Sequence, residues 1–573
     1  AGERGSVSRQ KGYRLLRNLL ILGSILAAIK LIFVDYTMDE EYQIVMAYRN
    51  LQGDTLFGTM WEPHQTSAFV CAVLLRLYTA ITGTTTGVVL FLRGITTGIQ
   101  LLFAVWMYRF LRQETEKEYA FLLACCYFNV VPKLIEIPEF SNLQLWGLTA
   151  VLLSLGYWRR NQRKLSWLAA AGLGMAVEVL AYPSDVILFP FFLVVIGLTC
   201  RQTDGRLLKP LIFGGTCVLC GILWLGAVFL QVAPEEFFRN IPYILQFDLT
   251  HDVTEVSGDK LAAIGADALR ELIFAGISCA VAGLAGLIAS KKSGKSFVAV
   301  FTVTAVLMAE GIQLFYWVIL QKGYEDPQIH WLVVWACALL FIRETGEGKR
   351  KYYVGMAAGF LVFLSVLYMS DLSLFYAIPH GIAGIFSALL LLIAVLQNDL
   401  GRNNGRRVIL FLLGSLCVVS VFGKGFVLRA GKTETNTVLG IGGIMKEGPA
   451  AGILTNYMQA YVNNCDYEDF SAYVEEGSSC LIVTNMVGTG GTSPYLFRNL
   501  SISHFSIVDP TSYDERLLTY WELYPEKVPD VIVVDCWYGQ LMEPADNWIM
   551  QYIENDFGYT RVEDGRYVRF YFR

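Results

Sequence analysis

Charged residues are scarce in this sequence of 573 residues. Only 17% of the residues are Asp, Glu, Lys or Arg, whereas 54% are hydrophobic. About a quarter of the residues in an average soluble protein are charged, so the composition excludes a wholly soluble chain. It predicts a polytopic α-helical membrane protein, with a soluble tail where the apolar runs end.

The sequence also has no concentrated basic patch. Its formal net charge is −5, and the lysines and arginines fall in short, separated clusters. Proteins that bind nucleic acids gather positive charge on one face or along one helix. Nucleic acid is therefore not an expected partner.

Cysteines that could serve a zinc or redox site are lacking as well. Of the twelve cysteines, nine lie in or beside apolar runs, where a thiol behaves as a small hydrophobe. Cys217 and Cys220 form a C-x-x-C pair inside such a run, without the polar, accessible surroundings that this chemistry needs. The tail holds Cys465, Cys480 and Cys536, which allow one disulfide and one free thiol if the tail lies outside the cytoplasm.

The first apolar run extends from about Leu19 to Val34. No small-residue cleavage site follows it, so we interpret it as a membrane span and not as a signal peptide. Basic flanks stay in the cytoplasm, which predicts a cytoplasmic N-terminus. The basic residues before this run are Arg4, Arg9, Lys11, Arg14 and Arg17.

Two apolar pieces follow the loop after this span. Thr66–Thr82 is short and contains Arg76, so we expect an interfacial or re-entrant helix on the outer side. Gly87–Leu111 is long enough to cross, since a span needs about 20 residues. Farther along, basic clusters alternate with segments that carry acids and aromatics. Placing the first kind inside and the second outside predicts about thirteen spans, with the tail outside. We expect the membrane to be a bacterial cytoplasmic membrane.

The tail begins near Arg429 with a Gly-rich connector. The short apolar runs SSCLIVTNM and PDVIVVDCWY then alternate with the amphipathic segments ILTNYMQAYVNN and PADNWIMQYIEND. This alternation predicts an α/β domain with a parallel or mixed sheet. The loop Gly488–Pro494 lacks the Lys-Ser/Thr ending of a phosphate-binding loop, so we interpret it as an ordinary loop. We expect a membrane domain over residues 1–428 and an extracytoplasmic domain over residues 429–573.

The stretch from 35 to 66 gathers more titratable groups at a membrane boundary than any other part of the chain. A charge near a bilayer is costly unless water, a protein cavity or a partner receives it. We therefore expect this first outer loop to carry the function. Its titratable residues include Asp35, Asp39, Glu40, Glu41, Asp54, Glu62 and His64.

The chain begins with an N-terminal span, followed by the run Asp39-Glu40-Glu41-Tyr42 and then Gly53-Asp54. An amphipathic piece and a long span with an arginine come next. This order of elements resembles that of the GT-C glycosyltransferases. Among these, the protein O-mannosyltransferases and the aminoarabinose transferases that modify lipid A are most similar in pattern. The resemblance covers the first 200 residues in sequence pattern and the whole chain in layout. It implies transfer of one sugar from a polyprenyl-phosphate carrier to a lipid, glycan or protein acceptor on the outer face, with inversion.

The family pattern also implies roles for individual residues. An acceptor hydroxyl that attacks the anomeric carbon must lose its proton, and a carboxylate within hydrogen-bond reach is a suitable base. Asp39 is the expected base and Glu40 its support, with both as ligands if a divalent metal ion (Mg²⁺ or Mn²⁺) is used. Glu139 matches the family's second acidic loop.

The leaving phosphate develops negative charge, which cations or a metal can stabilise. His64 stands where lipid A-modifying relatives use a lysine, and we expect contact with the phosphate or sugar. Arg93 lies inside the second crossing and must pair, either with a loop carboxylate or with the donor phosphate. Lys322 and Tyr324, in a late outer loop, are further candidates for the donor phosphate or sugar.

Other functions fit parts of the pattern. A transporter or flippase would need broken helices and ionisable residues near mid-membrane, but the acids here cluster at the outer boundary and no interrupted pair of segments repeats in two halves. A polysaccharide polymerase with a similar core would act on an oligosaccharide donor, which the sequence does not reveal. A non-catalytic protein that retains the fold is the third alternative.

Overall fold

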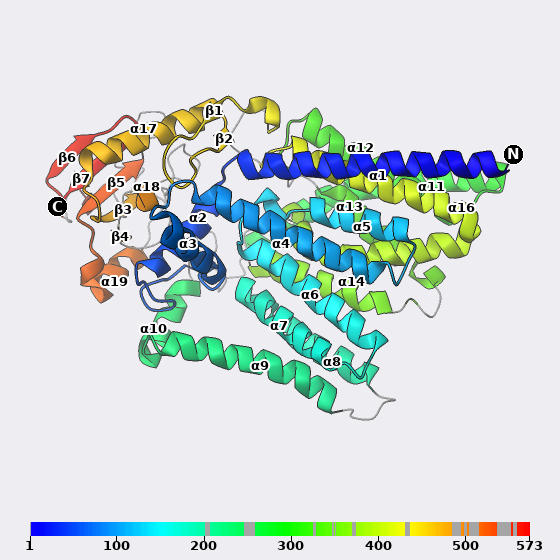
Figure 1. Ribbon diagram of the computed structural model, residues 1–573, viewed down its shortest axis with the longest axis horizontal. Coiled ribbons are helices and arrows are strands. Elements are labelled where there is room, and N and C mark those ends of the chain that lie inside the picture. The colour runs from blue at the N-terminus through cyan, green and yellow to red at the C-terminus, as the bar shows by residue number, and fades with distance from the viewer. Residues whose placement is uncertain are drawn as a thin grey trace.

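The computed structural model is a long bundle of helices with a small sheet at one end (Figure 1). The N-terminus lies at the opposite end from this sheet. We refer to these as the basic end, where α1 begins, and the sheet end. The structure describes residues 2–62, 64–200, 207–245, 258–324, 328–345, 349, 351–369, 374–429, 436–483, 494–497, 501–502, 515–535, 552–553 and 558–573.

Within the described residues, eight apolar stretches are long enough to cross a membrane. Two of them lie in one long helix that turns back at Gly401, whose φ of 69° suits glycine. Shorter or less apolar helices lie between these stretches, and the expected number of about thirteen crossings stays a prediction. The chain is thus a polytopic α-helical membrane protein. The long helices are α1 (Gly2–Phe33), α4 (Val88–Leu111), α9 (Leu208–Phe229), α11 (Gly258–Ser293), α12 (Phe297–Val318), α14 (Lys351–Met369) and α16 (Ile382–Phe426), and the others are α5 (Lys117–Asn129), α6 (Phe140–Arg160), α7 (Ser166–Ala181), α8 (Leu188–Thr199) and α13 (Ile329–Leu340).

Small residues let these helices approach closely. In α14, Gly355 and Gly359 form a G-x-x-x-G pair, and a Cβ at Gly359 would lie only 2.5 Å from the Cα of Gly384 in α16. Such close backbone contact is a common way for membrane helices to associate. The stretch Ile378–Gly401 lies in the middle of the bundle, and 94% of its most apolar 18 residues are buried inside the protein. Its neighbours therefore shield it almost completely from lipid.

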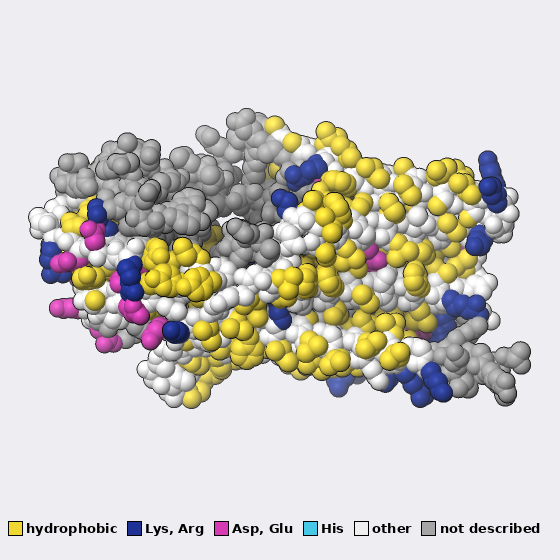
Figure 2. Space-filling model, turned by 90° about the horizontal axis from the view of Figure 1, so that it is seen from above, with side chains coloured by type: hydrophobic (Ala, Val, Ile, Leu, Met, Phe, Trp, Pro, Cys, Tyr) yellow, Lys and Arg dark blue, Asp and Glu magenta, His cyan; other side chains and the backbone are white. Residues whose placement is uncertain are grey.

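The surface follows the same division. Apolar side chains cover the helices, whereas acidic side chains gather mainly around the sheet end (Figure 2). Basic side chains lie where helices end or begin at the opposite end, as expected for loops that stay in the cytoplasm. They include Arg109, Arg159, Arg160, Lys291 and Lys292.

The first outer loop folds into two helices and a turn region at the sheet end. α2 (Met38–Leu51) opens with a capping box in which the Thr37 side chain and the Glu40 carboxylate satisfy each other's backbone N–H groups. α3 (Ala68–Thr82) ends at Gly83 in the left-handed region. It is seen nearly end-on in Figure 1, so it lies across the direction of α4 and does not follow the bundle.

The tail forms the predicted sheet. Both predicted strand segments are strands, β3 (Ser479–Val483) and β5 (Val531–Asp535), and they pair in parallel. The sheet order is β4-β3-β5-β7-β6, in which β4 (Ser501–Ile502) is parallel to β3, and β7 (Val568–Phe572) and β6 (Arg561–Asp564) are antiparallel additions. The predicted helix ILTNYMQAYVNN corresponds to α17 (Tyr457–Tyr473). The second predicted helix and the loop 488–493 lie almost entirely outside the described residues.

Arg49, at the end of α2, joins the first outer loop to the tail. Its side chain is fully buried and pairs with Asp54 and Glu62, each at 2.8 Å. It also donates to the hydroxyl of Tyr520, on α19 (Glu515–Leu523) of the tail, at 3.2 Å. The tail is therefore seated on the loop that sequence analysis singled out. Cys465 and Cys480, in the tail, are free thiols.

The charge division leads to a prediction about topology. Single cysteines introduced at Arg163, at the basic end, and at Glu475, in the tail, should lie on opposite sides of the membrane. In a background without other cysteines, a membrane-impermeant maleimide added to intact cells should label Glu475→Cys but not Arg163→Cys until the membrane is opened. Equal labelling of both before opening would contradict this topology.

Candidate active site

An arginine from α4 fixes the start of α2. Arg93 pairs with Glu40 through two bonds, Nε to Oε1 at 2.9 Å and Nη2 to Oε2 at 2.6 Å, and both side chains are almost completely buried. Its remaining N–H groups donate to backbone carbonyls at the end of α1 and just after it. These acceptors belong to Leu31, Ile32, Val34 and Asp35.

This arrangement bears on the two roles that the sequence left open for Arg93. All five N–H donors of a guanidinium are engaged inside the protein, so Arg93 has none left for a donor phosphate. Pairing with a loop carboxylate is the alternative that the structure favours. Glu40 in turn is a positioning residue, because both of its oxygens are committed to Arg93 and to the cap of α2.

Asp39 is adjacent to Glu40 but belongs to a different cluster. Its Oδ2 lies 2.7 Å from Nη2 of Arg429 and 3.6 Å from Nζ of Lys133. The side chain is 18% exposed, so a small molecule can reach it. Burial raises the pKa of the Asp39 carboxyl, but the charges of Arg429 and Lys133 outweigh it and hold that pKa well below its usual range. Asp39 is therefore ionised in the unliganded protein.

Lys133 reaches this cluster from an unusual backbone. It lies in the turn Pro132–Leu134, and both Lys133 and Leu134 have positive φ angles, 53° and 54°. This conformation is unfavourable for residues other than glycine and is often retained at functional sites. The ammonium also lies 4.4 Å from the centre of the Phe140 ring. The backbone turn thus directs a buried cation toward Asp39.

Arg429 comes from the opposite end of the sequence. It follows α16, whose last turn is tied to α1 because Lys30 Nζ donates to the Val427 carbonyl at 2.6 Å. The backbone N–H of Arg429 donates to Asp35 Oδ2 at 3.3 Å. The neighbouring Leu428 carbonyl accepts from the N–H of Tyr324 at 3.0 Å. Three separate segments therefore hold the guanidinium beside Asp39.

Glu139 caps α6 next to the same cations. Its two oxygens accept from the backbone N–H groups of Ser141 and Asn142, each at 2.9 Å. Burial raises the pKa of the Glu139 carboxyl to about 7, and the Asp39 charge acts in the same direction, against the opposing influence of Lys133 and the two N–H donors. Asp39 and Glu139 are thus two carboxyl groups whose environments separate their pKa values, a pattern typical of catalytic sites.

Aromatic rings line the space beside Glu139. His64 is stacked on Phe140, with ring centres 4.2 Å apart, and the edge of Tyr182 meets it at 5.2 Å. His380 meets Tyr182 at 5.7 Å, and its Nδ1 is hydrogen-bonded to Gln144 at 2.5 Å. His64 and Lys133 therefore both contact the ring of Phe140. This common contact places His64 close to the Asp39 cluster.

The two late candidates lie at the edge of this arrangement. Tyr324 is buried and stacked on Trp317 at 5.7 Å, so its ring supports the segment next to Arg429. Lys322 is exposed. Sequence analysis missed Lys133, Phe140 and Arg429 as site residues, although it had placed Arg429 at the start of the tail.

The pair Asp39 and Glu40 does not fit a metal ion. Asp39 is already balanced by two cations, and Glu40 is bound by the guanidinium of Arg93. Among the described residues, no three His, Cys, Asp or Glu side chains come together as metal ligands would. No step below is assigned to a metal.

No family model and no curated protein matches the chain. Solved structures of the archaeal oligosaccharyltransferase AglB from Archaeoglobus fulgidus do match. A complex with an inhibitory peptide and a dolichol-phosphate shows 11% identity and a TM-score of 0.36, covering 92% of this chain and 70% of that one. A form tethered to an acceptor peptide with the NVT sequon shows 11% identity and a TM-score of 0.36, covering 91% of this chain and 69% of that one. A complex with Zn and sulfate shows 11% identity and a TM-score of 0.35, covering 90% of this chain and 67% of that one.

Each of these neighbours is described as an oligosaccharyltransferase. A TM-score of 0.36 carries no argument about the reaction. The chemistry therefore has to rest on the residues described above.

The Arg93–Glu40 pair leads to a prediction about stability. Arg93→Gln leaves the Glu40 carboxylate buried without its partner, which typically costs about 3–5 kcal/mol, so the midpoint of thermal unfolding in detergent should fall markedly. Arg109→Gln, an exposed change on the same helix, should leave it nearly unchanged. The double variant Glu40→Gln/Arg93→Gln should lose less than the sum of its single changes. A midpoint for Arg93→Gln equal to that of Arg109→Gln would show that the pair does not hold the fold.

Proposed function

We propose that this protein transfers a monosaccharide from a polyprenyl-phosphate carrier to an acceptor hydroxyl on the extracytoplasmic face of the membrane. One observation carries the proposal: a reachable carboxylate, Asp39, is held between two cations, Lys133 and Arg429, at the sheet end of an apolar helix bundle. A carboxylate that can accept a proton beside cations that can bind phosphate is what this transfer requires.

In the unliganded protein, Asp39 occupies the place that the donor phosphate would take. Charge-assisted hydrogen bonds from arginine to phosphate are strong and often bidentate, so an arriving phosphodiester can draw Arg429 and Lys133 toward itself. The positive charge then acts on the phosphate and not on Asp39. Loss of that charge lets the pKa of Asp39 rise toward its ordinary value, which makes it a better base.

The transfer itself is a single displacement. The acceptor oxygen forms a bond to the anomeric carbon while the bond from that carbon to the phosphate oxygen breaks, with inversion. The phosphate leaves with the electron pair, and its growing negative charge is stabilised by Arg429 and Lys133. Asp39 takes the proton from the acceptor hydroxyl. Glu139 is the second candidate for this role, and His64 is placed to contact the donor.

The roles of the other parts follow from their positions. Arg93 and Glu40 orient α2 so that Asp39 faces the two cations. The tail, seated on the first outer loop through Arg49, shapes the acceptor side of the site. We place residues 1–428 in the membrane part and 429–573 in this acceptor-side domain.

The base assignment can be tested by one substitution. Asp39→Asn keeps the size of the side chain but cannot accept a proton, so transfer should fall by about 10²–10⁴ while donor binding persists. The measurement is transfer from a polyprenyl-phosphate sugar by the reconstituted protein, with binding measured in parallel. Glu475→Gln, an exposed change in the tail, serves as the control and should transfer at the wild-type rate.

Two outcomes would redirect the assignment. Turnover by Asp39→Asn near the wild-type rate would move the base elsewhere, with Glu139 first in line. Failure of the wild-type protein to bind any polyprenyl-phosphate sugar would overturn the glycosyltransferase proposal and favour the transporter alternative.

The raised pKa of Glu139 leads to a prediction about pH. Below about pH 7 its carboxyl is protonated and neutral, so the cluster around Lys133 is one unit more positive than above that pH. Donor affinity should therefore rise as the pH falls through about 7, by roughly tenfold if the interaction equals one pKa unit. Glu139→Gln, which is neutral at every pH, should bind with the higher affinity throughout. If the donor affinity of Glu139→Gln still changed with pH, the pH dependence would belong to another titratable group.

A further inference from the structure

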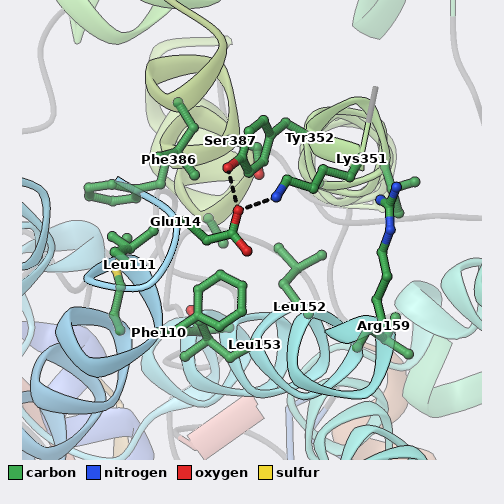
Figure 3. A pocket seen from close by; sticks show the side chains of 18 of the residues that line it. Phe110, Leu111, Glu114, Leu152, Leu153, Arg159, Lys351, Tyr352, Phe386 and Ser387 are labelled. Atoms are coloured by element: carbon green, nitrogen blue, oxygen red, sulfur yellow. Dashed lines mark hydrogen bonds and ion pairs between the residues drawn. The ribbon is translucent and has the colours of Figure 1, made fainter. Parts of the chain in front are cut away.

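A large cavity lies far from Asp39, toward the basic end of the bundle. It has a volume of about 380 Å³ and is lined by residues of α4, α5, α6, α8, α14 and α16. Figure 3 shows its wall, with Phe110, Leu152, Leu153 and Phe386 directed around the space and charged side chains at one edge. Neither the proposed transfer nor the tail uses this cavity.

The inner part of the cavity is an apolar shaft. Its polar groups at the deep end satisfy each other, since the Tyr127 hydroxyl donates to the Thr149 hydroxyl at 3.1 Å. Thr149 and Arg160 both line the cavity on α6, and eleven residues of helix rise about 16 Å. The shaft therefore has the length and lining to receive a hydrocarbon chain.

The rim carries an excess of positive charge. Glu114 is balanced by Arg160 at 2.7 Å and by Lys351, and it also accepts from the Tyr352 hydroxyl at 3.0 Å. Arg159 is exposed at the same rim and makes no hydrogen bond or ion pair within the described part of the chain. Figure 3 shows the Lys351–Glu114 contact and the guanidinium of Arg159 across the rim from it. Three cations thus face one carboxylate.

A second cavity adjoins the rim. It has a volume of about 360 Å³ and shares Glu114, Tyr352 and Leu390 with the first. Its own lining includes Glu116, Lys349 and Gln397. The charge of Glu116 is balanced by Arg406, whose Nε lies 3.1 Å from its Oε2. The apolar shaft therefore ends at a cationic rim, and a polar chamber lies beside that rim. An amphiphile with an apolar chain and an anionic head matches this order of surfaces.

We propose that this cavity binds one anionic phospholipid, with an acyl chain in the shaft and the phosphate between Arg159 and Lys351. Charge complementarity selects this occupant, because basic pockets between membrane helices on the cytoplasmic side recognise anionic lipid headgroups. The site is separate from the proposed donor site and lies at the other end of the bundle. It does not depend on the reaction proposed for Asp39.

The test is native mass spectrometry of the delipidated full-length protein, titrated with phosphatidylglycerol and, separately, with phosphatidylcholine of the same acyl chains. Phosphatidylglycerol should bind at one site more tightly than phosphatidylcholine. Arg159→Gln should weaken it about tenfold, as expected for a lost charge-assisted hydrogen bond. Arg163→Gln, an exposed arginine nearby that does not line the cavity, is the matched control and should bind as the wild type does.

A second pair of variants tests the shaft. Val195 lines the cavity on α8, whereas Val194 is 59% exposed on the same helix. Val195→Phe should fill the shaft and remove phosphatidylglycerol binding, while Val194→Phe should not. Millimolar inorganic phosphate should not displace the lipid.

Several results would overturn the site. Equal binding of the two lipids, or equal losses in Arg159→Gln and Arg163→Gln, would mean that the rim does not recognise the phosphate. If Val195→Phe bound phosphatidylglycerol as tightly as the wild type does, the lipid would have to lie outside the shaft. If inorganic phosphate displaced the lipid, the site would be one for a free anion and not for a phospholipid.

Discussion

The ion pair between Arg93 and Glu40 sets the geometry on which the candidate site depends. A charged side chain in a membrane span is tolerated only with a partner, and here one guanidinium satisfies a carboxylate and four backbone carbonyls. It therefore joins the end of α1, the start of α2 and the body of α4 at one point. Asp39, the residue before Glu40, then faces Lys133 and Arg429.

Much of the fold could be predicted from the sequence because its signals are local. Long apolar runs indicated the membrane helices, and runs of β-branched residues marked β3 and β5. The number of spans was harder to derive from hydropathy alone, since α5, α7, α8 and α13 are short. The count of about thirteen crossings rests on the alternation of charge along the chain and stays a prediction.

The candidate site was only partly predictable. The positions of Asp39 and Glu139 followed from the family resemblance, and both lie by the same cations. The separation of Asp39 from Glu40 was not foreseen, because the sequence analysis treated this stretch as a loop. It is helical, and adjacent residues on a helix point in different directions. Lys133 depends on two left-handed backbone positions, and Arg429 is brought in by packing of the segment after α16 against the end of α1. Neither effect has a signature in the sequence around the residue.

The burial of Ile378–Gly401 bears on how this protein is assembled. The stretch is made after most of the other helices, yet it occupies the middle of the finished bundle. It is apolar enough to rest in lipid on its own, and membrane helices can insert first and associate afterwards. The earlier helices must then leave a vacancy, or part again, to admit it. Assembly of the bundle is therefore completed from the C-terminal side, and the segment that brings Arg429 to Asp39 is delivered by that same late step.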